Sequence, residues 1–157
     1  MSATLSARVS ELNLLLPPAS PPAANYAPSL VQDGLLYISG QIGRIEGQPL
    51  QTGRLGDEVS TTQGIEAARQ AALGVLAQIA SATGDRLDRV ARVVKLTVFV
   101  AAAPGFDQQS QVANGASDLM TAVFGEAGRH VRSAVGVASL PAGAAVEVEA
   151  IVALAQG

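Results

Sequence analysis

The chain has no cysteine and only one histidine, His130. The absence of cysteine excludes disulfides and thiolate chemistry. A dedicated transition-metal site would need several carboxylates instead, and no such cluster occurs in the sequence, so we expect no metal. Aromatic residues make up only 3% of the chain, and there is no run of lysines or arginines. Proteins that bind nucleic acid usually present a basic face or aromatic stacking platforms, so nucleic acid is not an expected partner.

Long hydrophobic runs are also missing. The unbroken apolar stretch near the start, Leu14–Leu16, is far too short for the core of a signal peptide. No segment approaches the roughly 20 apolar residues of a membrane span. We therefore expect no membrane partner and a cytoplasmic location.

Charge is scarce as well, at 15% of the residues with a net charge of −3. A length of 157 residues is typical of one domain, and an apolar content of 48% is enough for one sizeable core. So few surface charges favour an oligomer that hides part of the surface.

The N-terminal segment reads differently from the rest of the chain. Residues 4–15 have the spacing of a short amphipathic helix, and the prolines of 17–24 (PPASPPAA) then favour extended chain. We divide the sequence into an N-terminal helix and Pro-rich arm at 1–24 and a domain at 25–157. The arm is expected to pack on the domain surface and not to act as a targeting signal.

Hydrophobic periodicity in the domain predicts four strands and two helices. Ser60 and Gln63 have the spacing of a capping box, and Gly84 marks the end of the helix that they begin. A second helix is expected over 107–124, weakened by Gly115. The predicted strands are Leu35–Ser39, Arg89–Val100, Val131–Ala138 and Ala145–Leu154. This order predicts an α+β domain with the sheet packed on two helices.

Arg132 and Glu147 are the charged residues that best fit a site. The turn residues between the last two strands predict an antiparallel hairpin. If that hairpin is symmetric about Ser139–Leu140, Arg132 and Glu147 are cross-strand neighbours, although a slip of one residue would separate them. The pair then has two interpretations. It is a surface salt bridge, or it is an anion-binding arginine beside a carboxylate that activates water.

Four other candidate residues also fit ordinary structural roles. Tyr26 follows the arm and fits a half-buried tyrosine, while Ser39 and Gly40 fit a turn at the end of a strand. A lone histidine such as His130 is more often structural than catalytic.

Six segments nevertheless occur in a familiar order: NYAP, LLYISGQIG, the long helix, VVKLTVFV, RSAVGVASLP and VEVEAIVAL. Over roughly residues 25–154 they resemble the RidA/YjgF-like family, often labelled endoribonuclease L-PSP. The most specific parts are SGQ and the R-S-x-V-x-V-x-x-L-P run followed by V-E-V-E-A. The stretch from ANGASDL to VASLP is typical of a subgroup distinct from the best-studied deaminases.

The resemblance implies a chorismate-mutase-like α+β fold and a homotrimer. In such trimers the sheets form a central barrel and the ligand clefts lie between subunits. Active family members hydrolyse enamine or imine intermediates, which leak from pyridoxal-phosphate enzymes, to 2-oxo acids and ammonia. The ligand is thus expected to be a small carboxylate-bearing metabolite. No cofactor is expected, because an imine is already electrophilic.

The resemblance also implies roles for individual residues. The family arginine that clamps the substrate carboxylate falls on Arg132, and the glutamate that positions water falls on Glu147. The pocket tyrosine falls on Tyr26, and the serine and glycine at the strand end fall on Ser39 and Gly40.

Two further positions are matched with departures from the family pattern. The family's helix asparagine is best matched by Asn114, although the lengths around it differ. Ala134 replaces a frequent cysteine whose role is thought to be largely through its backbone, and Ala24-Asn25 precedes the tyrosine in place of G-P. These departures bear on the substrate more than on the fold.

We expect an imine or enamine hydrolase, with a non-catalytic carboxylate-binding protein as the alternative. A ribonuclease fits least, because the chain is acidic.

Overall fold

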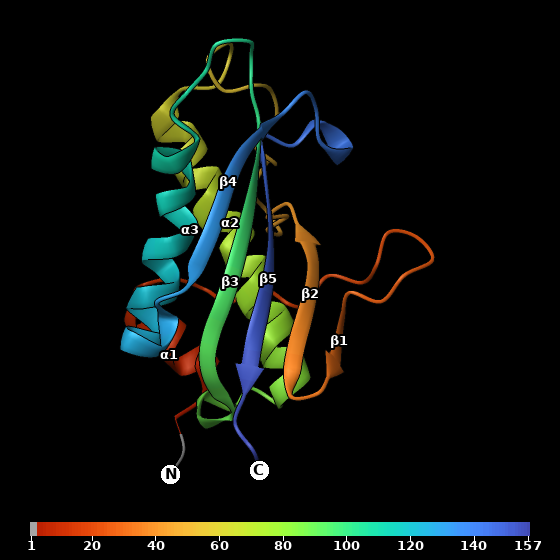
Figure 1. Ribbon diagram of the computed structural model, residues 1–157, viewed down its shortest axis with the longest axis vertical. Helices are drawn as coiled ribbons and strands as arrows, with labels where there is room; N and C mark the ends of the chain where they lie inside the picture. Colours follow the sequence, from red (N-terminus) through yellow and green to blue (C-terminus); the bar gives the residue numbers. More distant parts are fainter. Residues whose placement is uncertain (1–2) are drawn as a thin grey trace.

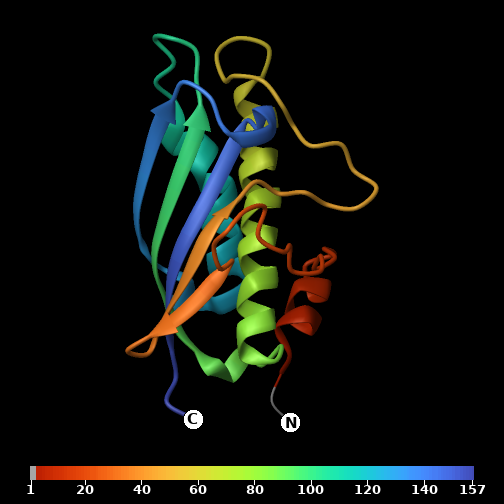
Figure 2. The same ribbon diagram turned by 90° about the vertical axis from the view of Figure 1, so that its right-hand side faces the viewer.

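The computed structural model describes residues 3–157 as one five-stranded sheet with helices packed on one of its faces (Figures 1 and 2). The strand order is β1-β2-β5-β3-β4, in which β3 and β4 run parallel and the other neighbours are antiparallel. The strands are β1 (Ser29–Gln32), β2 (Leu35–Gln41), β3 (Val90–Ala101), β4 (Val131–Val137) and β5 (Val146–Leu154). The helices are α1 (Leu5–Glu11), α2 (Thr61–Thr83) and α3 (Gln109–Phe124), with single 3-10 turns at Leu87–Arg89, Gly125–Gly128 and Pro141–Gly143. The predicted α+β class, with a mixed sheet on two long helices, is confirmed.

Helix α2 begins and ends where the sequence predicts. The Ser60 hydroxyl accepts from the backbone N–H of Gln63 at 3.2 Å, and the Ser60 N–H donates to the Gln63 side chain at 2.9 Å. Gly84 then ends the helix with a φ of 66°, a left-handed conformation that glycine adopts without penalty. Neither α2 nor any other helix among residues 3–157 is long and apolar enough to cross a membrane.

Helix α3 runs unbroken through Gly115, which the sequence predicts to weaken it. A Cβ atom at this position would collide with the main-chain carbonyl oxygen of Ile65 on α2. Glycine therefore lets the two helices approach closely, and this packing offsets its low helix propensity.

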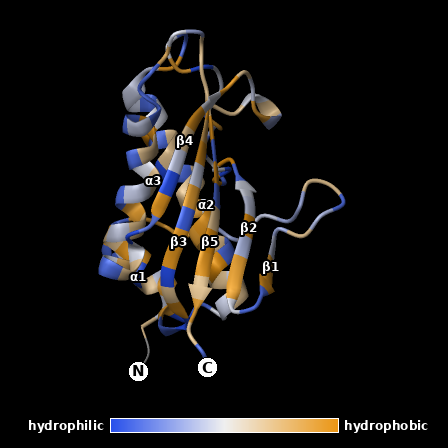
Figure 3. Cartoon of the chain, in the orientation of Figure 1, coloured by the Kyte–Doolittle hydropathy of each residue, from blue (hydrophilic) through white to orange (hydrophobic). Residues whose placement is uncertain are grey.

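The core lies between the sheet and the two long helices. Val146, Val148 and Val152 of β5 are buried there in alternation, and Figure 3 shows hydrophobic colour running along this strand. In β3 the alternation of Leu96, Val98 and Val100 would place Val94 on the buried face, but a register shift between Val93 and Lys95 turns Val93 inward instead.

The predicted hairpin between the last two strands is wrong. β3 lies between β4 and β5, so the two strands that follow each other in sequence are not neighbours in the sheet. The chain leaves β3, crosses over through α3 and returns as β4 parallel to β3, as a helical crossover requires. The turn residues before β5 reverse the chain direction, but they do not decide with which strand β5 pairs.

Strand β1 is absent from the sequence prediction. It is a four-residue edge strand joined to β2 by the two residues Asp33 and Gly34, whose φ angles are 53° and 77°. Positive φ at both positions is the geometry of a tight hairpin turn. The strand itself is mostly exposed, so it lacks the apolar alternation that marks a half-buried strand.

The N-terminal arm is held at two points. Helix α1 is shorter than the helix predicted at 4–15, and its residues Leu5 and Val9 are fully buried in the same core as the sheet. Further along, the buried amide of Gln78 donates to the Ser20 carbonyl at 2.8 Å. Beyond Ser20 the chain forms the loop that projects past β1 in Figure 1. The division of the chain at residues 24 and 25 stays a prediction.

Candidate functional site

Arg132 stands on the edge strand β4 and reaches across to helix α3. Its Nη1 donates to the Asn114 side-chain oxygen at 2.9 Å and to the Ser117 hydroxyl at 3.1 Å, and its Nη2 donates to the Ser110 carbonyl at 3.3 Å. His130, just before β4, completes the group through a 2.8 Å contact between its Nε2 and the Ser117 hydroxyl. We call Asn114, Ser117, His130 and Arg132 the arginine cluster.

The arginine cluster presents a fixed positive charge. A guanidinium carries five N–H donors. The three bonds to α3 orient its plane, and the Nε–H has no hydrogen-bond partner among the described residues. All three acceptors are neutral, and no salt bridge within residues 3–157 involves Arg132. An oriented, uncompensated guanidinium with free donors can bind a carboxylate.

Glu147 lies in a separate pocket, of about 170 Å³, at the far end of β2 and β5. We call it the glutamate pocket. Pro17, Pro18, Ser20, Pro21, Pro22 and Ala23 of the arm form one wall, and Tyr26, Gly40, Arg44 and Glu147 are among the residues that complete it. A Cβ atom at position 40 would overlap the Glu147 carboxylate, so only glycine leaves room for that group.

The Glu147 carboxyl is held in an unusual electrostatic state. Burial raises its pKa above the ordinary value, and repulsion from Glu149 two residues later adds to the rise. The carboxylate accepts no hydrogen bond and forms no salt bridge within residues 3–157. A carboxyl with a raised pKa and free oxygens can exchange a proton with a bound water.

Arg132 and Glu147 do not meet within one chain. Arg132 is level with Leu96 of β3, and Glu147 is level with Phe99, so they stand on opposite sides of β3 and three residues apart along it. Three residues is an odd number, so the two side chains leave opposite faces of the sheet. The predicted cross-strand pair and its interpretation as a surface salt bridge are therefore both wrong.

The remaining predicted residues divide between several places. Asn114 belongs to the arginine cluster, and Tyr26 and Gly40 belong to the glutamate pocket. Ala134 follows Arg132 by two residues and packs at the edge of the core. Ser39 donates its hydroxyl to the Ala27 carbonyl at 2.9 Å.

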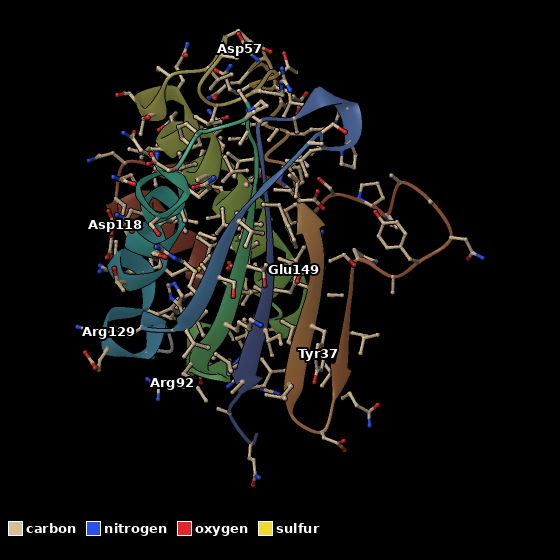
Figure 4. All side chains as sticks on the ribbon, turned by 45° about the horizontal axis from the view of Figure 1, so that its top comes forward. Tyr37, Asp57, Arg92, Asp118, Arg129 and Glu149 are labelled. Atoms are coloured by element: carbon tan, nitrogen blue, oxygen red, sulfur yellow. The ribbon has the colours of Figure 1, made fainter. Side chains whose placement is uncertain are left out.

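Ser39 lines a different hollow, on the open face of the sheet. The same hollow includes Tyr37 and Glu149, both labelled in Figure 4, together with Lys95 and Thr97. The sequence therefore groups in one place candidate residues that lie in three separate regions of the structure.

Sequence reasoning missed Ser117. Asn114 and Ser117 are three residues apart, so they share one face of α3, and this spacing was the available signal. No group of three or more histidine, cysteine, aspartate or glutamate residues in the described part of the chain could hold a metal ion.

Comparison with known proteins decides the family. The pattern of the endoribonuclease L-PSP family matches residues 18–154. The chain belongs to this family. The match begins within the Pro-rich arm, so helix α1 lies outside the matched residues.

Three relatives give the scale of similarity of this L-PSP family member. It is 51% identical to protein TCP17 of Trypanosoma cruzi over 154 residues, which covers 98% of this chain and 96% of the relative. It is 42% identical to the crystal structure of Atu1372 from Agrobacterium tumefaciens, with a TM-score of 0.88, covering 98% of this chain and 94% of that one. RidA from an Antarctic Psychrobacter is 27% identical, with a TM-score of 0.57 and coverage of 88% and 94%.

Proposed function

We propose that this L-PSP family member hydrolyses small enamine or imine intermediates to 2-oxo acids and ammonia. The observation that carries the proposal is the uncompensated guanidinium of Arg132, oriented by three hydrogen bonds with donors left free. Such a group suits the carboxylate of an amino-acid-derived imine. The likeness to a protein named RidA and the raised pKa of Glu147 support the same chemistry.

We further propose that the reaction occurs between two copies of the chain, in a homotrimer. Arg132 and Glu147 leave opposite faces of the sheet, so one chain supplies only half of each site. Val131 and Val135 on the other face of β4 are 65% and 44% exposed, which is costly for apolar side chains on a lone subunit. In the proposed trimer, a neighbouring copy docks along the edge strand β4, covers this face, and reaches past the edge with its own glutamate pocket to the arginine cluster.

In the proposed reaction, Arg132 binds the substrate carboxylate and holds the imine carbon near Glu147 of the neighbouring copy. The Glu147 carboxylate accepts a proton from water as the water oxygen attacks the imine carbon. An enamine substrate first tautomerises to the imine. After the attack, Glu147 gives the proton to the nitrogen. The C–N bond then breaks as the hydroxyl proton passes to the leaving nitrogen and the C=O forms, which leaves a 2-oxo acid and ammonia. Tyr26, Ser39, Gly40, Asn114 and Ala134 are proposed to shape the substrate site.

The test generates the short-lived imine in the assay mixture itself. A dehydratase acting on serine or threonine generates it, and oxo-acid release is timed with and without this protein. We expect faster release, and we expect Glu147→Gln to reduce the acceleration by about 100-fold or more, in the range that general bases contribute. Glu149→Gln, on the same face of the same strand, is the matched control and should retain most activity. No acceleration by the unaltered protein would reject the proposal.

A carboxylate-binding protein without turnover is the second candidate. Among residues 3–157 no group hydrogen-bonds to the Glu147 carboxylate, so none of them orients it as a base. Binding of 2-oxobutyrate or pyruvate without acceleration of hydrolysis would favour this alternative. Arg132→Ala should then abolish the binding while leaving the fold intact.

A further inference from the structure

We propose that His130 is a positioning residue, which sets the direction of the Arg132 guanidinium through the hydroxyl of Ser117. The inference rests on the proposed function, because it concerns how the carboxylate-binding arginine is held. Three segments meet here: α3 supplies Ser117, the loop before β4 supplies His130, and β4 supplies Arg132.

The hydrogen-bond partners decide the tautomer of His130. Its Nδ1 lies 2.7 Å from the Gly128 carbonyl oxygen, which can only accept, so Nδ1 carries the hydrogen. In the neutral ring Nε2 then holds a lone pair, and the Ser117 hydroxyl, 2.8 Å away, donates to it. This donation leaves the lone pairs of the hydroxyl oxygen available for the Nη1 hydrogen of Arg132, at 3.1 Å.

The relay therefore has one direction, from Arg132 to Ser117 to His130 to Gly128. Without the imidazole, the Ser117 hydroxyl is free to turn back to a carbonyl one turn earlier in α3, as serines within helices commonly do. Its oxygen would then leave the guanidinium, and Asn114 alone would hold Nη1. Asn114 and Ser117 lie one turn apart on α3 and both accept from Nη1, so loss of the Ser117 bond leaves the guanidinium with two of its three orienting bonds.

The far end of the relay is rigid. Gly128 is buried, and a Cβ atom there would collide with the Met120 carbonyl oxygen of α3. Gly128, whose carbonyl receives the His130 hydrogen, thus packs directly on the helix that carries Ser117. The imidazole is held at both ring nitrogens, by Ser117 of α3 at Nε2 and by Gly128 of the 3-10 turn at Nδ1, so it offers Arg132 a fixed support.

The experiment compares two substitutions of His130. A glutamine side chain can place its carbonyl oxygen near the position of Nε2, so His130→Gln keeps an acceptor for the Ser117 hydroxyl, whereas His130→Leu removes it. We expect His130→Leu and Ser117→Ala each to weaken pyruvate binding by roughly 3- to 30-fold, since each loses one hydrogen bond to a charged group's partner. His130→Gln should stay within about threefold of the unaltered protein, as expected for a retained neutral bond.

Three readouts separate positioning from mere stability. In turnover of an imine substrate, KM should rise while kcat changes little. Methyl pyruvate, which lacks the carboxylate, should bind equally to all variants. The double variant His130→Leu with Ser117→Ala should be no worse than either single one, because both remove the same interaction. Equal loss of affinity for methyl pyruvate, or additive losses in the double variant, would overturn the inference.

The inference can be tested even if no 2-oxo acid binds, an outcome that would reject the proposed function alone. The side-chain N–H signals of Arg132 in nitrogen-15 NMR, assigned by their loss in Arg132→Lys, report how tightly the guanidinium is held. They should keep their positions in His130→Gln and shift or broaden in His130→Leu. Identical Arg132 signals in both variants would show that His130 does not position the arginine.

Discussion

The arginine cluster and the glutamate pocket hold their charged groups in opposite ways. Arg132 has three hydrogen bonds to α3, and a relay through Ser117 and His130 lies behind it. The Glu147 carboxyl is partly buried, lies near the like charge of Glu149, and accepts no hydrogen bond from the described residues. One end of the proposed reaction site is thus oriented before a ligand arrives, whereas the other keeps a free carboxyl.

The two regions also differ in how regular the segments that form them are. The arginine cluster is built on a strand and a long helix, which position side chains firmly. Much of the glutamate pocket is built from the Pro-rich arm, an irregular segment with exposed residues, tied down at Ser20 by Gln78. In the proposed reaction, recognition of the carboxylate would therefore be preorganised, whereas the catalytic half would be completed by bound water and a neighbouring copy.

The largest expected effect removes the oriented charge. Arg132→Ala should weaken binding of pyruvate or 2-oxobutyrate by about 100-fold, because charge-assisted hydrogen bonds to the ligand are lost. Arg92→Ala removes an exposed arginine of β3 that makes no hydrogen bond to the arginine cluster, and it should leave the affinity unchanged. Isothermal titration calorimetry measures both. If the two variants bound equally well, the arginine cluster would not be the recognition half.

The second-largest effect separates turnover from ligand affinity. Gly40→Ala places a methyl group where the Glu147 carboxylate lies, so the carboxylate must move. Turnover should fall by about tenfold or more, as for a displaced general base, while oxo-acid affinity changes little. Steady-state kinetics together with a binding titration check this prediction. An equal fall in affinity would mean that the two regions do not act as separate halves.

A smaller effect tests the arm. Gln78→Leu removes the hydrogen bond that holds the Ser20 carbonyl, at a cost of about 1 kcal/mol in stability. Since the arm walls only the glutamate pocket, KM for bulkier imines should rise by roughly threefold to fivefold, in line with that energy. The Arg132 NMR signals should not change. Thermal unfolding and kinetics on two substrates of different size provide the measurement.

The smallest effect concerns pH. The pKa of Glu147 is raised in the folded state, so the unfolded chain ionises first as the pH rises. The unaltered protein should therefore lose stability as the pH climbs from the ordinary pKa of a glutamate through the raised one. Glu147→Gln removes this loss, so its advantage in Tm should grow across that window and then level off. A constant difference in Tm at all pH values would contradict the raised pKa.

Local patterns predicted most of the helices and strands, and the family-like motifs selected candidate residues that the structure places in three separate regions. The capping box at Ser60 and Gln63 is visible in the sequence because it depends on residues three apart. The relay through Ser117 and His130 was not visible, since its members come from different segments and meet only after α3 packs against β4. Strand β1 was not predicted because a mostly exposed edge strand has no buried face, and its sequence therefore lacks alternating apolar residues.

The sequence by itself determined the class of fold, both ends of helix α2 and the presence of an arginine and a glutamate in family-like runs. Only the tertiary structure decided that β3 inserts between β4 and β5, and hence that Arg132 and Glu147 leave opposite faces of the sheet. Periodicity and turn residues act over a few positions, whereas strand pairing is a choice among distant apolar partners. That choice depends on the α3 crossover and on packing of the whole core, which no short segment records.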